Sequence, residues 1–120
     1  MTALKTDTNK IVELNDRFRL SLGIPAFSGG IPGQVVMTAG IAALPADDMT
    51  AILTNVREFS DFTPDNDPRG EHDFGSFDHG GQRVFWKIDY YAPDMVHGSE
   101  NPADPCKTVR ILTIMLASEY

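Results

Sequence analysis

The sequence predicts a single α+β domain in which an antiparallel or mixed sheet of about four strands carries two helices, packed mainly on one face. Its 120 residues are a typical length for one domain. Two segments, about 9–20 and 45–59, place apolar residues at helical spacing. Four shorter segments show the alternation or the continuous apolar character of strands. The order of these segments suits helices that lie on a sheet.

The first predicted helix covers about residues 9–20. Ile11, Leu14 and Phe18 recur at the spacing that puts them on one helix face, with charged residues between them. Gly23 is expected to end the helix. The sequence therefore predicts an amphipathic helix at the start of the domain.

The segment 23–33 follows, with four glycines, two prolines and no charged residue. This composition is typical of a flexible connection, because glycine permits unusual backbone angles and proline interrupts regular structure. Residues 34–37 then form a short β-branched run before Gly40, which predicts a strand.

The second predicted helix begins at Pro45, a residue favoured at the first helical position. Asp47 and Asp48 follow in the first turn, where negative charge complements the helix dipole. An apolar stripe then predicts the face that packs on the sheet. The stripe consists of Met49, Ile52, Leu53, Val56 and Phe59.

A β-hairpin is predicted from residues 74–78 and 83–91, joined by a turn that contains Gly80 and Gly81. In its second strand one set of side chains faces the core, namely Val84, Trp86, Ile88 and Tyr90. Phe85 and Tyr91 lie on the opposite face. If that face is open, two copies of the chain could pair edge to edge as a homodimer.

The last predicted strand covers residues 109–117, VRILTIMLA, and is apolar on both faces. The segment is long enough for a helix, but its branched residues favour a strand. A strand with this composition is expected in the centre of a sheet, where both of its faces are covered.

Composition limits the function. Seventeen acidic and ten basic residues give a formal charge of −7, which disfavours direct binding of nucleic acid. No apolar run is long enough to cross a membrane, and the first residues do not resemble a secretory signal, so a cytoplasmic location is expected. Cys106 is the only cysteine, which excludes an internal disulfide. No motif for a nucleotide or other cofactor is present.

The candidate site is the loop 61–73, DFTPDNDPRGEHD, which holds five carboxylates between two apolar segments. Prolines, Gly70 and Asp or Asn side chains are typical of a structured surface loop. A second acidic loop is expected around residues 94–104. The candidate partner-binding residues of the two loops are Asp65, Asp67, Arg69, Glu71, His72, Asp73, Glu100 and Asp104.

An alternative interpretation of the first loop is a metal site. Carboxylates and an imidazole can hold a divalent metal that activates water, which would make the chain a hydrolase. This hypothesis uses Asp67, Glu71, His72 and Asp73. Adjacent residues of an extended segment point to opposite sides, however, so the metal site is the less favoured interpretation and no metal is assigned.

Several long segments resemble a small bacterial family of unknown function that is often encoded on plasmids and other mobile elements. They are NDRFR (15–19), DFTPDNDPRGEHDFGSF (61–77), RVFWKIDYY (83–91), GSENPADP (98–105) and VRILTIMLASEY (109–120). The similarity covers nearly the whole chain after residue 14, although residues 22–32 depart from the family pattern. The resemblance supplies no catalytic residue.

The resemblance implies a context. Mobile elements carry small acidic proteins that block host defences by occupying a site on a larger enzyme. We therefore expect a non-enzymatic protein-binding module whose acidic loops meet a basic surface, such as an inhibitor of the anti-CRISPR or antirestriction type. The remaining alternatives are the metal-dependent hydrolase and an accessory protein that binds a co-encoded partner.

Overall fold

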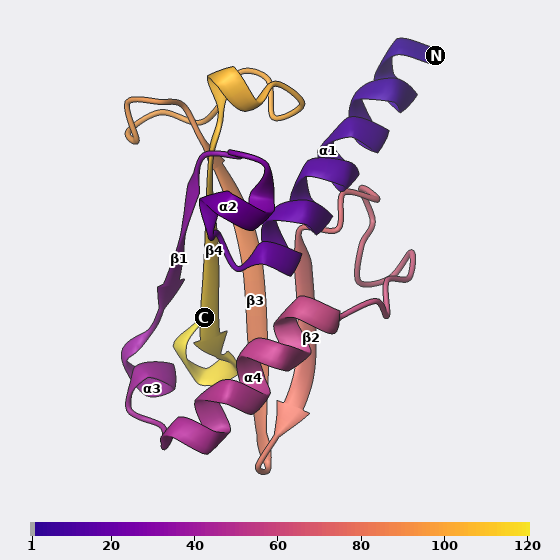
Figure 1. Ribbon diagram of the computed structural model, residues 1–120. Helices are drawn as coiled ribbons and strands as arrows, with labels where there is room; N and C mark the ends of the chain where they lie inside the picture. The colour runs from indigo at the N-terminus through magenta and orange to yellow at the C-terminus, as the bar shows by residue number, and fades with distance from the viewer. Residues whose placement is uncertain (1) are drawn as a thin grey trace.

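Four strands form one mixed sheet in the order β1-β4-β3-β2 (Figure 1). In this computed structural model the backbone is described for residues 2–120 and the side chains from residue 7 onward. β4 pairs in parallel with β1 and antiparallel with β3, and β3 pairs antiparallel with β2. The strands are β1 (Gly33–Met37), β2 (Phe74–His79), β3 (Gln82–Tyr91) and β4 (Val109–Leu116).

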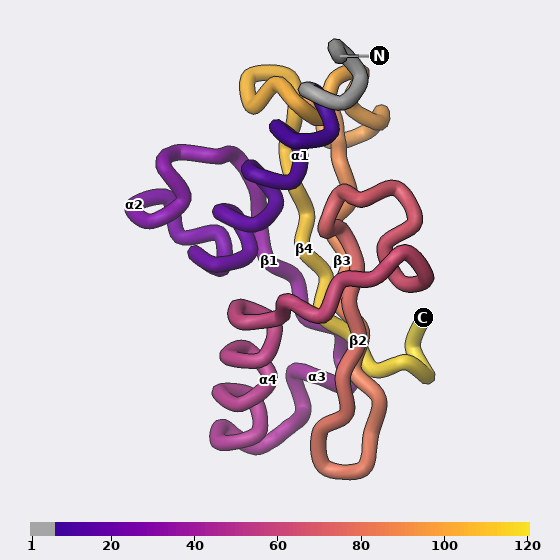
Figure 2. Tube along the Cα trace, turned by 90° about the vertical axis from the view of Figure 1, so that its right-hand side faces the viewer, coloured from indigo at the N-terminus to yellow at the C-terminus, as the bar shows by residue number. Residues whose placement is uncertain are grey.

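The helices lie mainly on one face of this sheet. Figure 2 shows α2 and α4 on one side of the strands and the carboxy-terminal turn on the other. The prediction of an α+β domain with two main helices on a four-stranded mixed sheet is therefore confirmed. The helices are α1 (Thr2–Ser21), α2 (Pro25–Ser28), α3 (Ala39–Ala42) and α4 (Ala46–Glu58), with short 3-10 turns η1 (Pro105–Lys107) and η2 (Ala117–Glu119).

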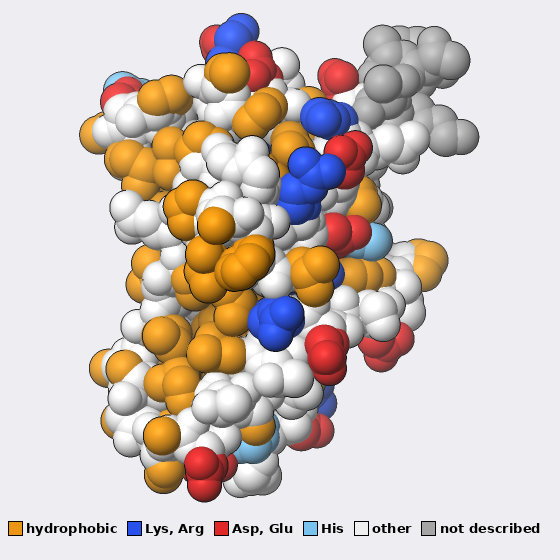
Figure 3. Space-filling model, in the orientation of Figure 1, with side chains coloured by type: hydrophobic (Ala, Val, Ile, Leu, Met, Phe, Trp, Pro, Cys, Tyr) orange, Lys and Arg blue, Asp and Glu red, His pale blue; other side chains and the backbone are white. Residues whose placement is uncertain are grey.

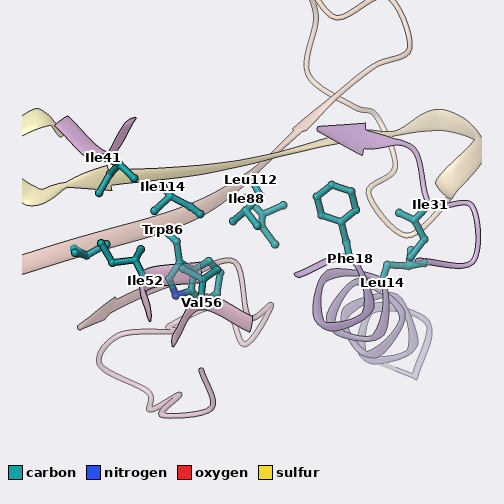
Figure 4. Close-up of a cluster of buried hydrophobic side chains, with 11 residues drawn as sticks. Leu14, Phe18, Ile31, Ile41, Ile52, Val56, Trp86, Ile88, Leu112 and Ile114 are labelled. Atoms are coloured by element: carbon teal, nitrogen blue, oxygen red, sulfur yellow. The ribbon is translucent and has the colours of Figure 1, made fainter. Parts of the chain in front are cut away.

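The hydrophobic core fills the space between the helices and the sheet. Leu14 and Phe18 of α1 and Ile52 and Val56 of α4 are buried against the strands, and Trp86 of β3 is fully buried among them. Figure 4 shows the cluster extending from Ile31 and Phe18 beside α1 to Ile41 and Ile52 at the other end. The predicted apolar faces of both helices are confirmed.

The β-hairpin agrees closely with the sequence. Gly80 and Gly81 both have positive φ, at 58° and 79°, which is the turn geometry that lets two antiparallel strands join without splaying. Val84, Trp86 and Ile88 are buried, as the alternation in β3 predicted. β4 lies between β1 and β3, so the prediction of a central strand is confirmed.

Some boundaries differ from the prediction. α1 begins at Thr2 rather than near residue 9, since no proline or glycine precedes the apolar stripe to interrupt the helix. Pro45 is the N-cap of α4 rather than its first residue. α3 was not predicted, because four residues are too few to show a helical period.

Residues 23–33 contain more structure than their composition indicated. Pro25 begins the short helix α2, and Gly29, with φ of 72°, ends it in the left-handed conformation. Ser28 and Ile31 are buried. This segment therefore packs against the end of α1 and contributes to the core.

β3 has partners on both sides, β4 and β2. The strand that carries Phe85 and Tyr91 is therefore internal, and an edge-to-edge contact between two copies cannot use it. The prediction fails because β4 occupies the position beside β3 that a second copy would need, and the order of the strands could not be predicted from the sequence. Phe85 instead packs against Phe74 and Tyr120, with ring centroids 5.3 and 5.6 Å away.

Among the described residues, no helix combines the length and the apolar composition that crossing a bilayer requires.

Candidate functional site

The two acidic loops lie toward the same end of the sheet. The 61–73 loop joins α4 to β2, and the 94–104 loop belongs to the connection between β3 and β4. Figure 1 shows the second loop beyond the ends of β3 and β4, and the first loop beside α1 on the β2 side. The Asp73 carbonyl accepts a hydrogen bond from the backbone N–H of Ile88, so the first loop continues the hairpin beside β3.

A buried polar network connects the two loops. Arg110 of β4 donates from Nε to Oδ1 of Asn15 on α1 at 2.7 Å, and from Nη2 to the carbonyl of Pro102 in the second loop at 2.7 Å. Asn15 in turn donates from Nδ2 to the Tyr90 hydroxyl at 2.8 Å and to the carbonyl of Glu71 in the first loop at 3.0 Å. The Tyr90 hydroxyl donates to a Glu71 carboxylate oxygen at 2.9 Å.

Burial has clear electrostatic effects in this network. Arg110 has no exposed surface, and desolvation lowers its pKa, although a guanidinium remains charged near neutral pH. Desolvation also raises the pKa of Tyr90, which keeps the hydroxyl protonated and able to donate to Glu71. The Arg110 guanidinium lies 5.3 Å from the centre of the Tyr90 ring, a favourable cation–π distance. The network therefore fixes both loops to α1, β3 and β4.

Asp67 holds the first loop from within. Its Oδ1 accepts hydrogen bonds from the backbone N–H groups of Glu71 at 3.1 Å and His72 at 3.3 Å. His72 has a φ of 56°, which is unusual for a residue with a side chain and carries a conformational cost. The two bonds to Asp67 offset that cost and fix the turn.

His72 joins the loop to α1. Its Nδ1 lies 2.9 Å from a carboxylate oxygen of Asp16, and its ring stacks on Phe62 with a centroid distance of 3.8 Å. Phe62 is also 5.5 Å from the guanidinium of Arg19, which donates to the carbonyl of Val56 in α4. These contacts attach the loop to both main helices.

The last carboxylate of the loop, Asp73, pairs with Arg69 at 2.9 Å. Burial raises the pKa of Asp73, and the charge of Arg69 partly opposes that shift. The carboxylate of Asp73 is therefore held by the loop itself, while Arg69 is mostly exposed.

The outer side of the first loop carries Asp61 and Asp65. Both side chains are exposed, and neither carboxylate forms an ion pair or a hydrogen bond with the residues that the structure describes. In the second loop Glu100 is exposed and lies 3.4 Å from Lys107, and Asp104 accepts from the N–H of Cys106 at the start of η1. Hydrogen bonds from His97 and from the Val96 N–H lower the pKa of Asp94 to about 2, so this exposed carboxylate stays ionised.

The predicted site residues thus fall into two groups. The side chains of the first group are held by contacts within the chain, and those of the second group are exposed. The first group is Asp67, Glu71, His72, Asp73 and Asp104, and the second is Asp65, Arg69 and Glu100. The four residues of the hypothetical metal site do not form a ligand set. The side chains of Glu71, His72 and Asp73 contact Tyr90, Asp16 and Arg69, respectively. Asp67 accepts hydrogen bonds from backbone N–H groups of the loop itself. Across residues 7–120, no group of three or more His, Cys, Asp or Glu side chains is placed to hold a metal ion.

Sequence reasoning missed Asn15, Asp16 and Arg110 as site residues. Arg110 did carry a signal, since a charged residue in an otherwise apolar central strand must find polar partners inside the fold. Asn15 and Asp16 sit on α1, more than fifty positions from the loop that they contact. Nothing local in the sequence connects them to it.

This geometry defines a class of protein: a small α+β domain in which a buried polar network supports two acidic surface loops. The chain belongs to the family described as a protein of unknown function (DUF3768), whose family model matches residues 37–119. The match includes both acidic loops and all of β2, β3 and β4. No curated protein and no solved structure matches the chain.

The contrast between Asp67 and Asp65 gives a first prediction. Asp67→Ala is expected to lower the free energy of unfolding by about 2 kcal/mol, because two backbone N–H groups lose their acceptor. Hydrogen exchange at the amides of Glu71 and His72 should accelerate by more than the global change explains. Urea denaturation and amide exchange measured by NMR would check both effects.

Asp65→Ala is the matched control, because it removes a carboxylate from the same loop at a position without a side-chain hydrogen bond or ion pair among the described residues. Its effect on stability should stay within about 0.5 kcal/mol. Equal effects of the two substitutions would contradict the assignment of Asp67 as the residue that fixes the loop.

Proposed function

We propose that this chain is a non-enzymatic binding protein whose two acidic loops contact a basic surface of another protein. The observation that supports the proposal most directly is that some residues of the 61–73 loop fix its conformation while others are exposed. Asp67 and His72 fix its conformation, while Asp61 and Asp65 face solvent without a partner among the described residues. A loop that is ordered before binding loses less conformational entropy when it binds.

The charge of the chain supports a partner with a basic surface. The chain has a formal charge of −7, and the unpaired carboxylates of the first loop are joined by Asp94 and Glu100 of the second. Such a field attracts a positively charged protein surface over several ångströms and accelerates encounter with it. The same field opposes binding to nucleic acid or to an anionic membrane.

The family context narrows the proposal. Enzymes of host defence that bind or cut nucleic acid have basic grooves, and an acidic protein that occupies such a groove would compete with the nucleic acid. The resemblance described above implies that this chain is encoded on a mobile element, which would gain from blocking those enzymes. We therefore propose an inhibitor of a host defence enzyme, of the anti-CRISPR or antirestriction type.

The decisive experiment compares two triple variants that lose equal charge. The loop variant carries Asp61→Asn, Asp65→Asn and Glu100→Gln. The control carries Asp47→Asn, Glu58→Gln and Asp78→Asn, three exposed carboxylates outside the loops. Partners are captured from a host lysate, identified by mass spectrometry and purified, and affinity is then measured over a range of salt concentrations.

The loop variant should bind its purified partner about tenfold more weakly, with a smaller dependence on salt, while the control stays within about twofold of the wild type. The partner's nuclease activity should fall when the wild-type chain is added in equal amount. Equal losses in both variants, or an affinity that does not change with salt, would refute the proposed contact. Capture of only a co-encoded protein would favour the accessory role instead.

A further inference from the structure

A groove of opposite character lies where the end of α1, α2 and the end of α4 meet, and none of its lining residues belongs to the acidic loops. It encloses about 470 Å³, and we call it the arginine-flanked groove. Figure 3 shows hydrophobic side chains gathered over α2 and the end of α1, with basic side chains toward α1 and α4. The residues that define it are Arg17, Leu20, Leu22, Ile24, Phe27 and Arg57.

The apolar part of this groove is unusually exposed. Leu20, Ile24 and Phe27 expose 56%, 50% and 74% of their surface, although each is a large hydrophobic residue. Single exposed apolar residues are common, but three that line one groove form a patch of the kind that marks an interaction site. Because Phe27 stands so far into solvent, a small molecule would stay largely uncovered here, whereas a polypeptide could cover the patch.

Both arginines can accept a carboxylate. Arg57 uses Nε to donate to the Leu20 carbonyl at 3.0 Å, which positions the side chain at the end of α1. Its two terminal nitrogens make no hydrogen bond or ion pair within residues 7–120. Among the described side chains Arg17 pairs only with Glu13, at 3.4 Å, and this exposed pair is one that a partner's carboxylate could replace at small cost.

We propose that the arginine-flanked groove binds a short segment of a partner protein that carries large apolar side chains next to Asp or Glu. The apolar side chains cover Leu20, Ile24 and Phe27, and the carboxylates pair with Arg17 and Arg57. Arginine suits this role because its planar group can bind a carboxylate through two parallel hydrogen bonds.

Charge favours this occupant over two others. The formal charge of −7 repels a bilayer of anionic lipid, because a bilayer interacts with the charge of the whole chain. A short segment interacts mainly with the two nearby arginines, because salt screens the more distant charges. In a symmetric contact of two copies through this groove, the arginines of one copy would face those of the other.

This inference does not depend on the proposed function of the acidic loops. Leu20, Ile24 and Phe27 lie outside residues 37–119, the part that the family model matches. The groove therefore combines a surface from the amino-terminal part of this chain with one arginine, Arg57, from the family domain.

The test uses a displayed library of short random peptides, selected on the wild-type protein. Enriched sequences should combine Leu, Phe or Ile with Asp or Glu. The best peptide is then synthesised with its carboxylates intact and with each one replaced by an amide, and both versions are titrated into ¹⁵N-labelled protein. The acidic version should shift the amides of residues 20–27 and bind about tenfold more tightly than the amidated version.

Variants locate the contact. Phe27→Asp should abolish binding, and Arg17→Gln should weaken it about fivefold, which is the loss of one exposed charge pair of about 1 kcal/mol. Val96→Asp and Arg83→Gln are matched controls, because they make the same types of change on other exposed surfaces, and they should bind as the wild type does. The loop variant with Asp61→Asn, Asp65→Asn and Glu100→Gln should also bind normally.

Four outcomes would overturn the inference. Enriched peptides without carboxylates would remove the role of the arginines, and binding that survives Phe27→Asp would place the contact elsewhere. Co-sedimentation with phosphatidylglycerol vesicles that Phe27→Asp abolishes would identify a lipid surface as the occupant. Self-association in sedimentation velocity that the same substitution abolishes would identify a second copy of the chain.

Discussion

Arg110→Ala is expected to lower the free energy of unfolding by about 4 kcal/mol, a large share of the total stability of a small domain. The substitution leaves Oδ1 of Asn15 and the carbonyl of Pro102 without their donor inside the fold. It also creates a cavity at a residue that has no exposed surface. Urea denaturation monitored by the fluorescence of Trp86 would measure the loss.

Arg110→Met separates the two causes of this effect. Methionine fills most of the space of the arginine stem but cannot donate to Asn15 or Pro102. The substitution also relieves the cost of burying the guanidinium, whose Nη1 atom has no hydrogen-bond partner among the described atoms. The free energy of unfolding is therefore expected to fall by only about 2 kcal/mol. If neither variant differs from the wild type by more than about 1 kcal/mol, the network does not hold the loops in place.

Local periodicity determines which parts of the fold can be predicted from the sequence. Periodicity finds α4 and the hairpin because their buried side chains recur at fixed intervals, and Ile52, Val56, Val84 and Trp86 are all buried in the structure. The pairing of β1 with β4 joins residues that are far apart in the chain, and no local pattern encodes it. Strand order therefore had to come from the structure.

The candidate site divides in the same way. The composition of the 61–73 loop identified it as a structured surface loop, because Asp, Asn, Pro and Gly each favour turns for local reasons. Which carboxylates face outward depends on contacts with α1 and β3. His72 contacts Asp16 and Glu71 contacts Tyr90, whereas the Asp65 carboxylate has no hydrogen bond or ion pair with the part of the chain that the structure describes. A local pattern of charges cannot separate these residues.

The arginine-flanked groove was missed for a different reason. Four glycines and two prolines in residues 23–33 indicated flexibility, and the exposed apolar residues among them had no period to reveal a face. In the structure Pro25 and Gly29 begin and end one helical turn. That turn presents Phe27 beside Leu20 of α1. Glycine and proline here specify a defined shape.

Gly33→Ala is expected to destabilise the protein by about 3 kcal/mol, at the upper end of what overpacking costs. A Cβ atom at this position would lie 2.4 Å from the carbonyl oxygen of Arg110 and 2.5 Å from the ring of Phe18. The first neighbour is backbone in the central strand β4, and the second is a fully buried ring that anchors α1, so neither can move aside cheaply. The melting temperature should fall by roughly 10 °C.

Gly98→Ala is the matched control for this prediction. A Cβ atom there would lie 3.9 Å from its nearest neighbour, the carbonyl oxygen of Tyr90, and the residue has no positive φ. The control should therefore stay within about 0.5 kcal/mol of the wild type, so that a loss confined to Gly33→Ala reports the close approach of β1, β4 and Phe18. Because Phe18 and Asn15 lie on neighbouring turns of α1, the displacement of Phe18 should also accelerate amide exchange in the 61–73 loop. Normal stability of Gly33→Ala would show that β1 and α1 do not approach each other as closely as this packing requires.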